Sequence, residues 1–232
     1  MRAHIEQLVS RTRQRLKLAA DNLSGRSEAD RASSFWESLT DYHEQNDFDE
    51  TGIGRSRWLA TELIPGLGIE SVLEVGTNSG RNLAALREHH PHMRLKGIDV
   101  NARAIDWARA HHPGIEFEHG DANHWTQPPD SFDAILTMSV LDHIPDDATE
   151  DLAENFARTA TKYVIAVELW DGENATRGPF KYSRDTKALF ERHRFETVRW
   201  EVAPGQYDTE HSLLWLYVGA PPRSSGSAKN ND

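Results

Sequence analysis

Three acidic side chains follow predicted strands in the middle of the sequence. Glu74, Asp99 and Asp121 each lie at or near the carboxyl end of a short apolar run, and the three runs are successive. In a parallel sheet these ends meet at one edge, where ligands bind. Asp99 is suited to accept hydrogen bonds from two ribose hydroxyls. Asp121 is suited to accept one from an adenine amino group, beside the backbone N–H of Ala122. The pattern favours a ligand that contains adenosine.

A glycine turn joins the first of these strands to a helix. Gly76 allows a sharp turn after the strand, and Gly80 allows the backbone to pass close to a ligand at the helix start. A dinucleotide fingerprint would place glycine at positions 78 and 81, where this sequence has Asn78 and Arg81. Without these glycines the backbone cannot approach a pyrophosphate closely, which argues against a nicotinamide cofactor. Taken alone, the glycine pair is also compatible with an ordinary strand–helix turn.

Strands and helices alternate in the part of the chain that carries these residues. This alternation predicts an α/β fold with a doubly wound, mostly parallel sheet. The last two predicted strands follow one another without a helix, which indicates an antiparallel pair at one edge. The predicted strands span residues 71–75, 94–98, 115–118, 133–138, 163–168, 199–202 and 213–218, and the helices 81–89, 102–110, 149–160 and 184–192.

The N-terminal region has a different pattern. An apolar stripe predicts a helix over 5–22, and a polar stretch from 24 to 34 then interrupts the helical pattern. Phe35, Trp36 and Leu39 begin a short helical patch, an acidic loop follows, and a helix over 57–64 stops at Pro65. The predicted organisation is an N-terminal helical extension or lid (1–56), an α/β domain that binds the ligand (57–220) and a disordered tail (221–232).

The composition limits the classes of partner. The net charge of −11 makes a phosphate backbone an unfavourable partner, so no nucleic acid is expected. The chain has no cysteine, and its two His-His-Pro sequences fall where helices should end rather than at zinc-ligand spacing, so no metal is predicted. The first residues lack the apolar stretch of a signal peptide, and no run is long enough to span a membrane. These features favour a cytoplasmic protein without membrane association.

The motifs together resemble those of class I S-adenosylmethionine-dependent methyltransferases. The resemblance covers roughly residues 58–220, and it rests on Glu74-x-Gly76-x-x-x-Gly80, Asp99, Asp121-Ala122, the stretch 131–135 and the stretch 140–145. More narrowly, the glycine turn with Asn78 and Asn82, the stretches 167–170 and 183–185, and the upstream Phe35-Trp36 resemble methylases associated with pseudaminic acid biosynthesis.

The resemblance implies that residues 57–220 form a methyltransferase domain that binds S-adenosyl-L-methionine as cofactor, and it assigns residues to that cofactor. Gly76, Asn78 and Gly80 would line the methionine portion, with Glu74 contacting its amino group directly or through water. Asp99 would bind the ribose, and Asp121 and Ala122 the adenine. The full predicted set of cofactor residues is Glu74, Gly76, Thr77, Asn78, Gly80, Asp99, Val100, Asp121, Ala122 and Met138. Most class I methyltransferases have glycine where this sequence has Asn78, so the methionine portion is expected to bind in a slightly different way. Met138 is equally compatible with a place in the core.

Methyl transfer from a sulfonium needs alignment and, for an acceptor that must lose a proton, a general base. His143, after the fourth predicted strand, is the first candidate because histidine titrates near neutrality. Asp142 is the second catalytic candidate. His143 is also compatible with packing or capping beside the following helix. The predicted substrate-binding residues are Trp36, Tyr42, Glu168 and Tyr182, and residues 170–182 are expected to form a substrate loop.

The predicted activity is therefore methyl transfer to an oxygen or nitrogen of a small molecule, such as a sugar or a natural-product intermediate. A macromolecular methyltransferase is the second hypothesis, although the Asn/Asp-Pro-Pro-aromatic motif of enzymes that methylate nucleic-acid amino groups is missing at 137–140. The third is a non-catalytic S-adenosylmethionine-binding partner. The helix over 5–22 has a further possible role as the contact of a homodimer.

Overall fold

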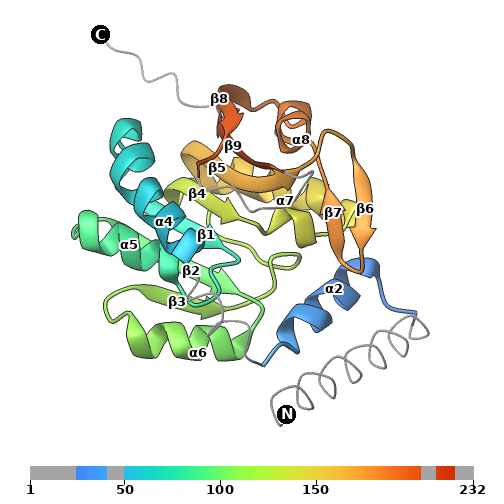
Figure 1. Cartoon of the computed structure of the whole chain (residues 1–232), viewed down its shortest axis with the longest axis horizontal. Coiled ribbons are helices and arrows are strands. Elements are labelled where there is room, and N and C mark those ends of the chain that lie inside the picture. The colour runs from blue at the N-terminus through green and yellow to red at the C-terminus, as the bar shows by residue number, and fades with distance from the viewer. Residues whose placement is uncertain (1–24, 41–49, 205–212, 223–232) are drawn as a thin grey trace.

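A seven-stranded sheet forms the centre of the molecule (Figure 1). A computed structural model describes residues 25–40, 50–204 and 213–222. The strand order is β3-β2-β1-β4-β5-β9-β8, and the first five strands are parallel. The strands are β1 (Ser71–Val75), β2 (Arg94–Asp99), β3 (Glu116–His119), β4 (Phe132–Met138), β5 (Ala160–Trp170), β8 (Glu196–Val202) and β9 (Leu213–Ala220).

The antiparallel edge expected from the last two strands is present. β9 pairs antiparallel with both β5 and β8. A separate two-stranded hairpin, β6 (Ala175–Gly178) and β7 (Lys181–Ser183), follows β5. The predicted fold, a doubly wound and mostly parallel α/β sheet, is confirmed.

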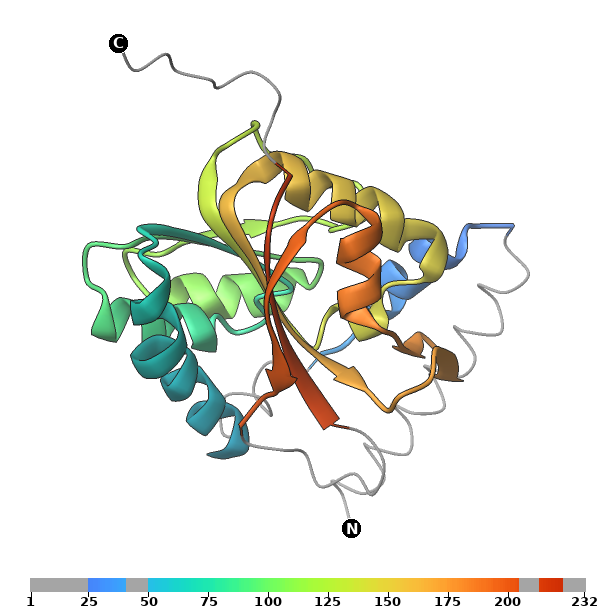
Figure 2. The ribbon, with the colours of Figure 1, turned by 90° about the horizontal axis from the view of Figure 1, so that it is seen from above.

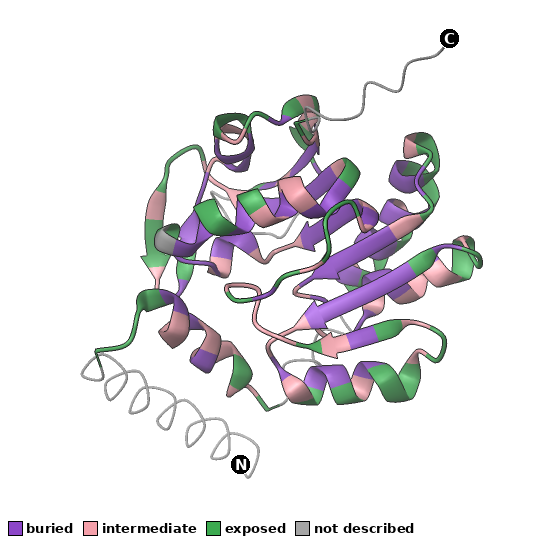
Figure 3. Cartoon of the chain, turned by 180° about the vertical axis from the view of Figure 1, so that it is seen from behind, coloured by how far each residue is buried: buried purple, intermediate pink, exposed green. Residues whose placement is uncertain are grey.

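Helices cover both faces of the sheet, as the view from above shows (Figure 2). One core cluster joins the sheet to α4 (Glu50–Trp58) with its continuation 59–67, to α5 (Arg81–His89) and to α6 (Ala102–His111). The other joins it to α7 (Asp146–Thr159), α8 (Thr186–Arg192) and α2 (Glu28–Glu37). Buried residues run along the strands and along one stripe of each covering helix (Figure 3).

Several predicted bounds change in the structure. Residues 28–34, predicted as a polar interruption, are helical in α2, which Ser27 caps by accepting from the Asp30 backbone N–H. The buried positions of this helix are the small residues Ala29, Ala32 and Ser34, so it has no large apolar stripe. Residues 50–54, predicted as loop, belong to α4.

The segment 170–182, predicted as a substrate loop, is mostly strand in the structure. β5 continues to Trp170, and most of the remaining residues form the β6–β7 hairpin. The helix predicted to begin at Thr149 begins at Asp146. The two His-His-Pro sequences do end helices, because α5 stops at His89 and α6 at His111.

In the described part of the chain, no helix is long and apolar enough to cross a membrane. The predicted helix over 5–22, the residue Tyr42 and most of the predicted tail lie outside the described residues.

Candidate functional site

A cavity opens at the carboxyl ends of β1, β2 and β4, the edge at which the sequence places its acids. Its walls come from the turn after β1, the segments after β2, β3 and β4, and helices α2, α4 and α5. The empty space in it, solvent at the open mouth included, amounts to about 1170 Å³. Of the predicted residues it is lined by Trp36, Gly76, Thr77, Asn78, Asp99, Val100, Asp121, Ala122, Met138 and His143.

The turn after β1 adopts the conformation that its glycine predicts. Gly76 has φ of 74°, and a Cβ atom built there would stand 2.3 Å from the Val140 side chain. Asn78 also has a positive φ, of 49°, a region that asparagine tolerates better than most residues. The backbone N–H groups of Gly76 and Thr77 both donate to the carbonyl oxygen of Ile98, which holds this turn against β2.

Asp99 is the last residue of β2 and fixes the surrounding loops. Its Oδ2 accepts from the Asn78 backbone N–H and its Oδ1 from that of Asn101, both at 2.8 Å. Burial raises the pKa of the Asp99 carboxyl, and these two donors act against that rise. Each carboxylate oxygen retains a further lone pair, so Asp99 can still accept from ligand hydroxyls while it holds the turn.

Glu74 lies behind the cavity wall rather than on it. The side chain is 1% exposed, and its two oxygens accept from Thr77 Oγ1 (2.7 Å) and Asn82 Nδ2 (2.6 Å). Burial raises its pKa to about 7, although both hydrogen bonds favour the ionised form. Thr77 and Asn82 line the cavity, so Glu74 orients the groups that a ligand would meet.

Helix α2 forms part of the cavity wall and is attached to the rest of the chain on two sides. At its start, Tyr182 Oη donates to Glu28 Oε1 at 2.6 Å. Farther along the helix, Asn123 Nδ2 donates to Ser33 Oγ at 3.0 Å. Near its end, the side-chain amide of Asn101, which follows β2, donates to the carbonyl oxygens of Trp36 and Leu39. The first contact holds α2 to the β6–β7 hairpin, which meets it in Figure 1, and the others hold it to the loops after β2 and β3.

The other end of the cavity is aromatic. The rings of Trp36 and His143 lie 4.2 Å apart between centroids. His143 belongs to the short 3₁₀ helix η3 (Leu141–His143), and its Nδ1 lies 3.0 Å from the carbonyl oxygen of Phe180. Because a carbonyl oxygen only accepts, this contact places the proton of a neutral imidazole on Nδ1 and leaves Nε2 as the basic nitrogen.

Comparison with known proteins agrees with this architecture. Residues 72–162 match the family model of a methyltransferase domain. Trans-aconitate 2-methyltransferase of Methylobacterium radiotolerans is 30% identical over 115 residues, which cover 48% of this chain and 44% of that protein. Ubiquinone biosynthesis O-methyltransferase of Aeromonas salmonicida is 28% identical over 100 residues, 41% of each chain. The chain spans less than half the length of the curated relatives it matches.

Solved structures share the fold over most of the chain. An S-adenosylmethionine-dependent methyltransferase of Leishmania major superposes with a TM-score of 0.67 at 16% identity and covers 83% of each chain. The 1,6-didemethyltoxoflavin-N1-methyltransferase of Burkholderia thailandensis, solved with its substrate and S-adenosylhomocysteine, gives 0.61 at 15% identity, with 79% of this chain and 84% of that one covered. The chain therefore shares the fold of these solved structures.

Not every predicted site residue reaches the cavity. Gly80 has φ of 80°, but a Cβ there would meet the Phe117 ring at 2.7 Å. The need for glycine at position 80 is thus explained by the positive φ and by the contact with Phe117, not by close approach to a ligand. Asp142 is 2% and Glu168 1% exposed, and both point into the interior. Tyr182 is buried against α2, away from the cavity lining.

Some cavity residues were not predicted from the sequence. Arg55 of α4 is 2% exposed, and Asn82 of α5 donates to Glu74 and approaches Met138 Sδ at 3.7 Å. Asn101 caps α6 by accepting from two backbone N–H groups while its amide holds α2. Asn82 belongs to the motif behind the narrower resemblance, and an asparagine before a predicted helix signals a cap. For Arg55 the sequence offers no comparable signal.

Proposed function

We propose that this protein transfers a methyl group from S-adenosyl-L-methionine to an oxygen or nitrogen of a small molecule. The observation that carries the proposal is Asp99, which ends β2 on the wall of the cavity and pins the glycine turn by two hydrogen bonds. The relatives named above, which are methyltransferases by name, support the same activity.

The residues present fit this cofactor. The side-chain oxygen of Asn78 is buried on the cavity wall without a hydrogen-bond partner among the described residues, so a ligand donor such as an ammonium group would satisfy it. Asp99 would hold the ribose hydroxyls, and Asp121 with the Ala122 backbone the adenine. Val100 and Met138 would flank the purine and the sulfonium, and the cationic Arg55 suits the methionine carboxylate.

The cofactor supplies an activated methyl group, so the protein must align the acceptor and exclude water. Trp36 and His143 form the aromatic end of the cavity, and Trp36 belongs to α2 in its wall. His143 is suited to take a proton from the acceptor, because Nδ1 is engaged with the Phe180 carbonyl and Nε2 is left as the basic nitrogen.

A small acceptor suits this geometry better than a macromolecule, because α2, which the β6–β7 hairpin contacts through Tyr182, contributes Ala32, Ser33 and Trp36 to the cavity wall. The names of the relatives, trans-aconitate 2-methyltransferase and ubiquinone biosynthesis O-methyltransferase, are in keeping with a small acceptor. A sugar, as the resemblance to pseudaminic acid methylases implies, or a natural-product intermediate stays the proposed class. A cytoplasmic location, the absence of nucleic acid as a partner and a homodimer through the helix over 5–22 stay predictions.

Calorimetry with S-adenosylmethionine and S-adenosylhomocysteine tests the proposal. We expect both to bind at a single site with dissociation constants in the micromolar range, about −8 kcal/mol. Turnover is then followed as S-adenosylhomocysteine release with panels of hydroxy acids, sugars and phenols, and with RNA and protein as comparison acceptors. No binding would refute the proposal. Binding without turnover on any acceptor would favour the non-catalytic partner, and turnover on RNA or protein the macromolecular enzyme.

A further inference from the structure

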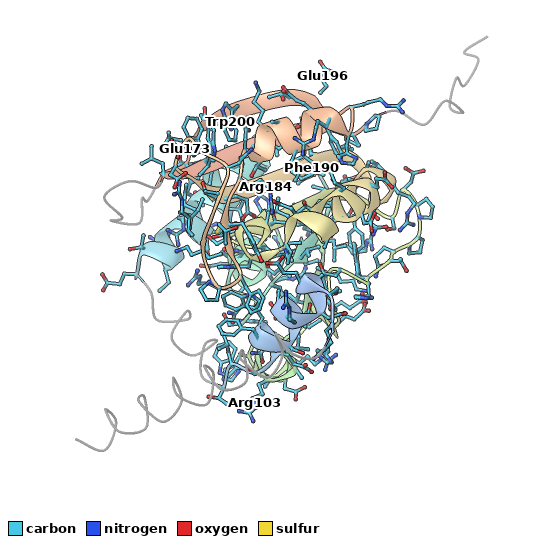
Figure 4. All side chains as sticks on the ribbon, turned by 90° about the vertical axis from the view of Figure 1, so that its right-hand side faces the viewer. Arg103, Glu173, Arg184, Phe190, Glu196 and Trp200 are labelled. Atoms are coloured by element: carbon cyan, nitrogen blue, oxygen red, sulfur yellow. The ribbon has the colours of Figure 1, made fainter. Side chains whose placement is uncertain are left out.

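Strand β8 forms one edge of the seven-stranded sheet. It pairs with β9 on one side, and no other strand of the described residues lies along its other side. Glu196 and Trp200 of β8, labelled in Figure 4, lie in the upper part of that view, and Arg103 of α6 lies at the bottom. An edge strand presents unpaired backbone N–H and C=O groups, to which a strand of another chain can add.

Exposed apolar side chains gather on β8 and its neighbour β9. Four large apolar residues are exposed in the part of the chain that the structure describes. Val198 (48%) and Val202 (42%) belong to β8, and Leu213 (41%) begins β9. Apolar residues that are exposed singly need no explanation, but three of the four on two adjacent strands indicate an interaction surface.

The hydrogen bonds to β9 show which backbone groups of β8 face outward. The backbone N–H of Ala203, just after β8, donates to a carbonyl oxygen of β9 at 2.8 Å. In an antiparallel ladder this direction alternates from one residue to the next. The backbone groups of Glu201 therefore also face β9, whereas those of Trp200 and Val202 face away from it. A β-bulge before Arg199 ends the alternation, so the regular outward-facing stretch is short.

The charged side chains of β8 are ordered so that a second copy of the strand matches them. Arg199 and Glu201 lie on the same face of the sheet and form an ion pair, with side chains 39% and 50% exposed. A second β8 can lie antiparallel to the first with the two Trp200 residues opposite each other. Arg199 of each copy then lies opposite the partner's Glu201. Two ion pairs between the copies thus join the two within them.

The same charges disfavour the neighbouring registers. A contact centred on Arg199 or on Glu201 would set two like charges directly opposite each other, which destabilises an antiparallel pair. Charged residues on an edge strand ordinarily oppose association with another chain. In β8 their order makes one register attractive, the one centred on Trp200. In that register the outward N–H and C=O groups of the two Trp200 residues form both hydrogen bonds of a symmetric pair.

We propose that β8 is the interface of a homodimer in which two copies of this chain join their sheets edge to edge, about a two-fold axis at Trp200. A two-fold contact uses the same surface of both copies, and the order of Arg199 and Glu201 satisfies this requirement. The paired stretch is short, so the dimer is weak and depends on concentration. The surface differs from the predicted helix over 5–22, and the inference does not depend on the proposed methyl transfer.

Two charge variants of the full chain test this interface. Arg199→Glu makes both charged positions acidic, and Glu201→Arg makes both basic. Each variant alone should dimerise at least about tenfold more weakly than the native chain, because attractive pairs become repulsive. Mixed in equal amounts, the two variants should form a heterodimer with a dissociation constant within about threefold of the native value, because each acidic position then faces a basic one. Both variants keep a negative net charge, so general attraction does not bring them together.

Sedimentation equilibrium measures these dissociation constants, and a fluorescent label on one variant reports the heterodimer. The control pair is Arg103→Glu and Asp106→Arg, two exposed positions of α6 that undergo the same charge changes and should leave dimerisation unchanged. A native chain that stays monomeric up to about 0.5 mM would overturn the proposal. So would a mixture that dimerises no better than the separate variants. A dimer that survives in both single variants uses another surface, such as the helix over 5–22, and would overturn it too.

Amide hydrogen exchange of the native chain tests the strand pairing without any variant. The Trp200 N–H faces outward in a single copy, so its exchange should become at least about tenfold slower once the dimer predominates. The Glu201 N–H, which faces β9, should change much less between low and high protein concentration. NMR resolves the two amides. A dimer that leaves the exchange of Trp200 unchanged is not joined through β8, and this result would contradict the proposal.

Discussion

Replacing Asp99 by alanine should weaken S-adenosylhomocysteine binding by about a hundredfold, or roughly 2.7 kcal/mol. The structure contributes two terms to this estimate. A hydrogen bond between a charged acceptor and a ribose hydroxyl is worth about 1.5–3 kcal/mol. The backbone N–H groups of Asn78 and Asn101 also lose their acceptor, so the glycine turn becomes less ordered before the ligand binds. Asp99→Asn keeps one acceptor oxygen and should lose less.

Calorimetry with S-adenosylhomocysteine and its 2′-deoxyribose analogue separates the two terms. If Asp99 binds the hydroxyls, the loss from the variant and the loss from the analogue should overlap rather than add. Asp106→Asn on the exposed face of α6 is the control, because its ion pair with Arg109 is at the surface. Affinity of the alanine variant within twofold of the native value would remove Asp99 from the ribose site. Fully additive losses would leave it only the role of holding the turn.

Three further outcomes are expected. Gly76→Ala should lower the melting temperature and abolish cofactor binding, since φ is 74° and the new methyl would stand 2.3 Å from Val140; a normal melting curve would contradict this. Tyr182→Phe removes the hydrogen bond to Glu28, so α2 should be held less firmly. Hydrogen-exchange mass spectrometry should then show faster exchange in α2, and steady-state kinetics a KM that rises more than kcat falls. Burial raises the pKa of Glu168 from 4.5 to about 8 in the folded protein, so the free energy of unfolding should fall as pH rises between these values. In Glu168→Gln, denaturant unfolding at several pH values should show a smaller fall. An equal fall in the variant would refute the raised pKa of Glu168.

The strands and helices around the glycine turn were predictable from sequence because their apolar patterns are strong. β1 and α5 have the predicted bounds, and the order of acids at strand ends pointed to the edge of the sheet at which the cavity opens. Helix α2 was missed because its buried face consists of alanine and serine, which carry little hydrophobic signal. The contacts that hold it over the cavity join residues far apart in sequence, such as Ser33 and Asn123, and no local pattern encodes them.

The acids differ in role because each lies at a different distance from the end of its strand. Asp99 is the last residue of β2 and Asp121 lies beyond β3, so both reach the cavity. Glu168 was expected at the tip of its strand, but β5 continues two residues further to Trp170. In this extension β5 still pairs with β9, as far as Trp170 opposite Leu213. Glu168 is therefore buried within the sheet and does not lie at its edge. Two additional residues of strand thus change a predicted substrate contact into a buried acid that holds the turn of the candidate base.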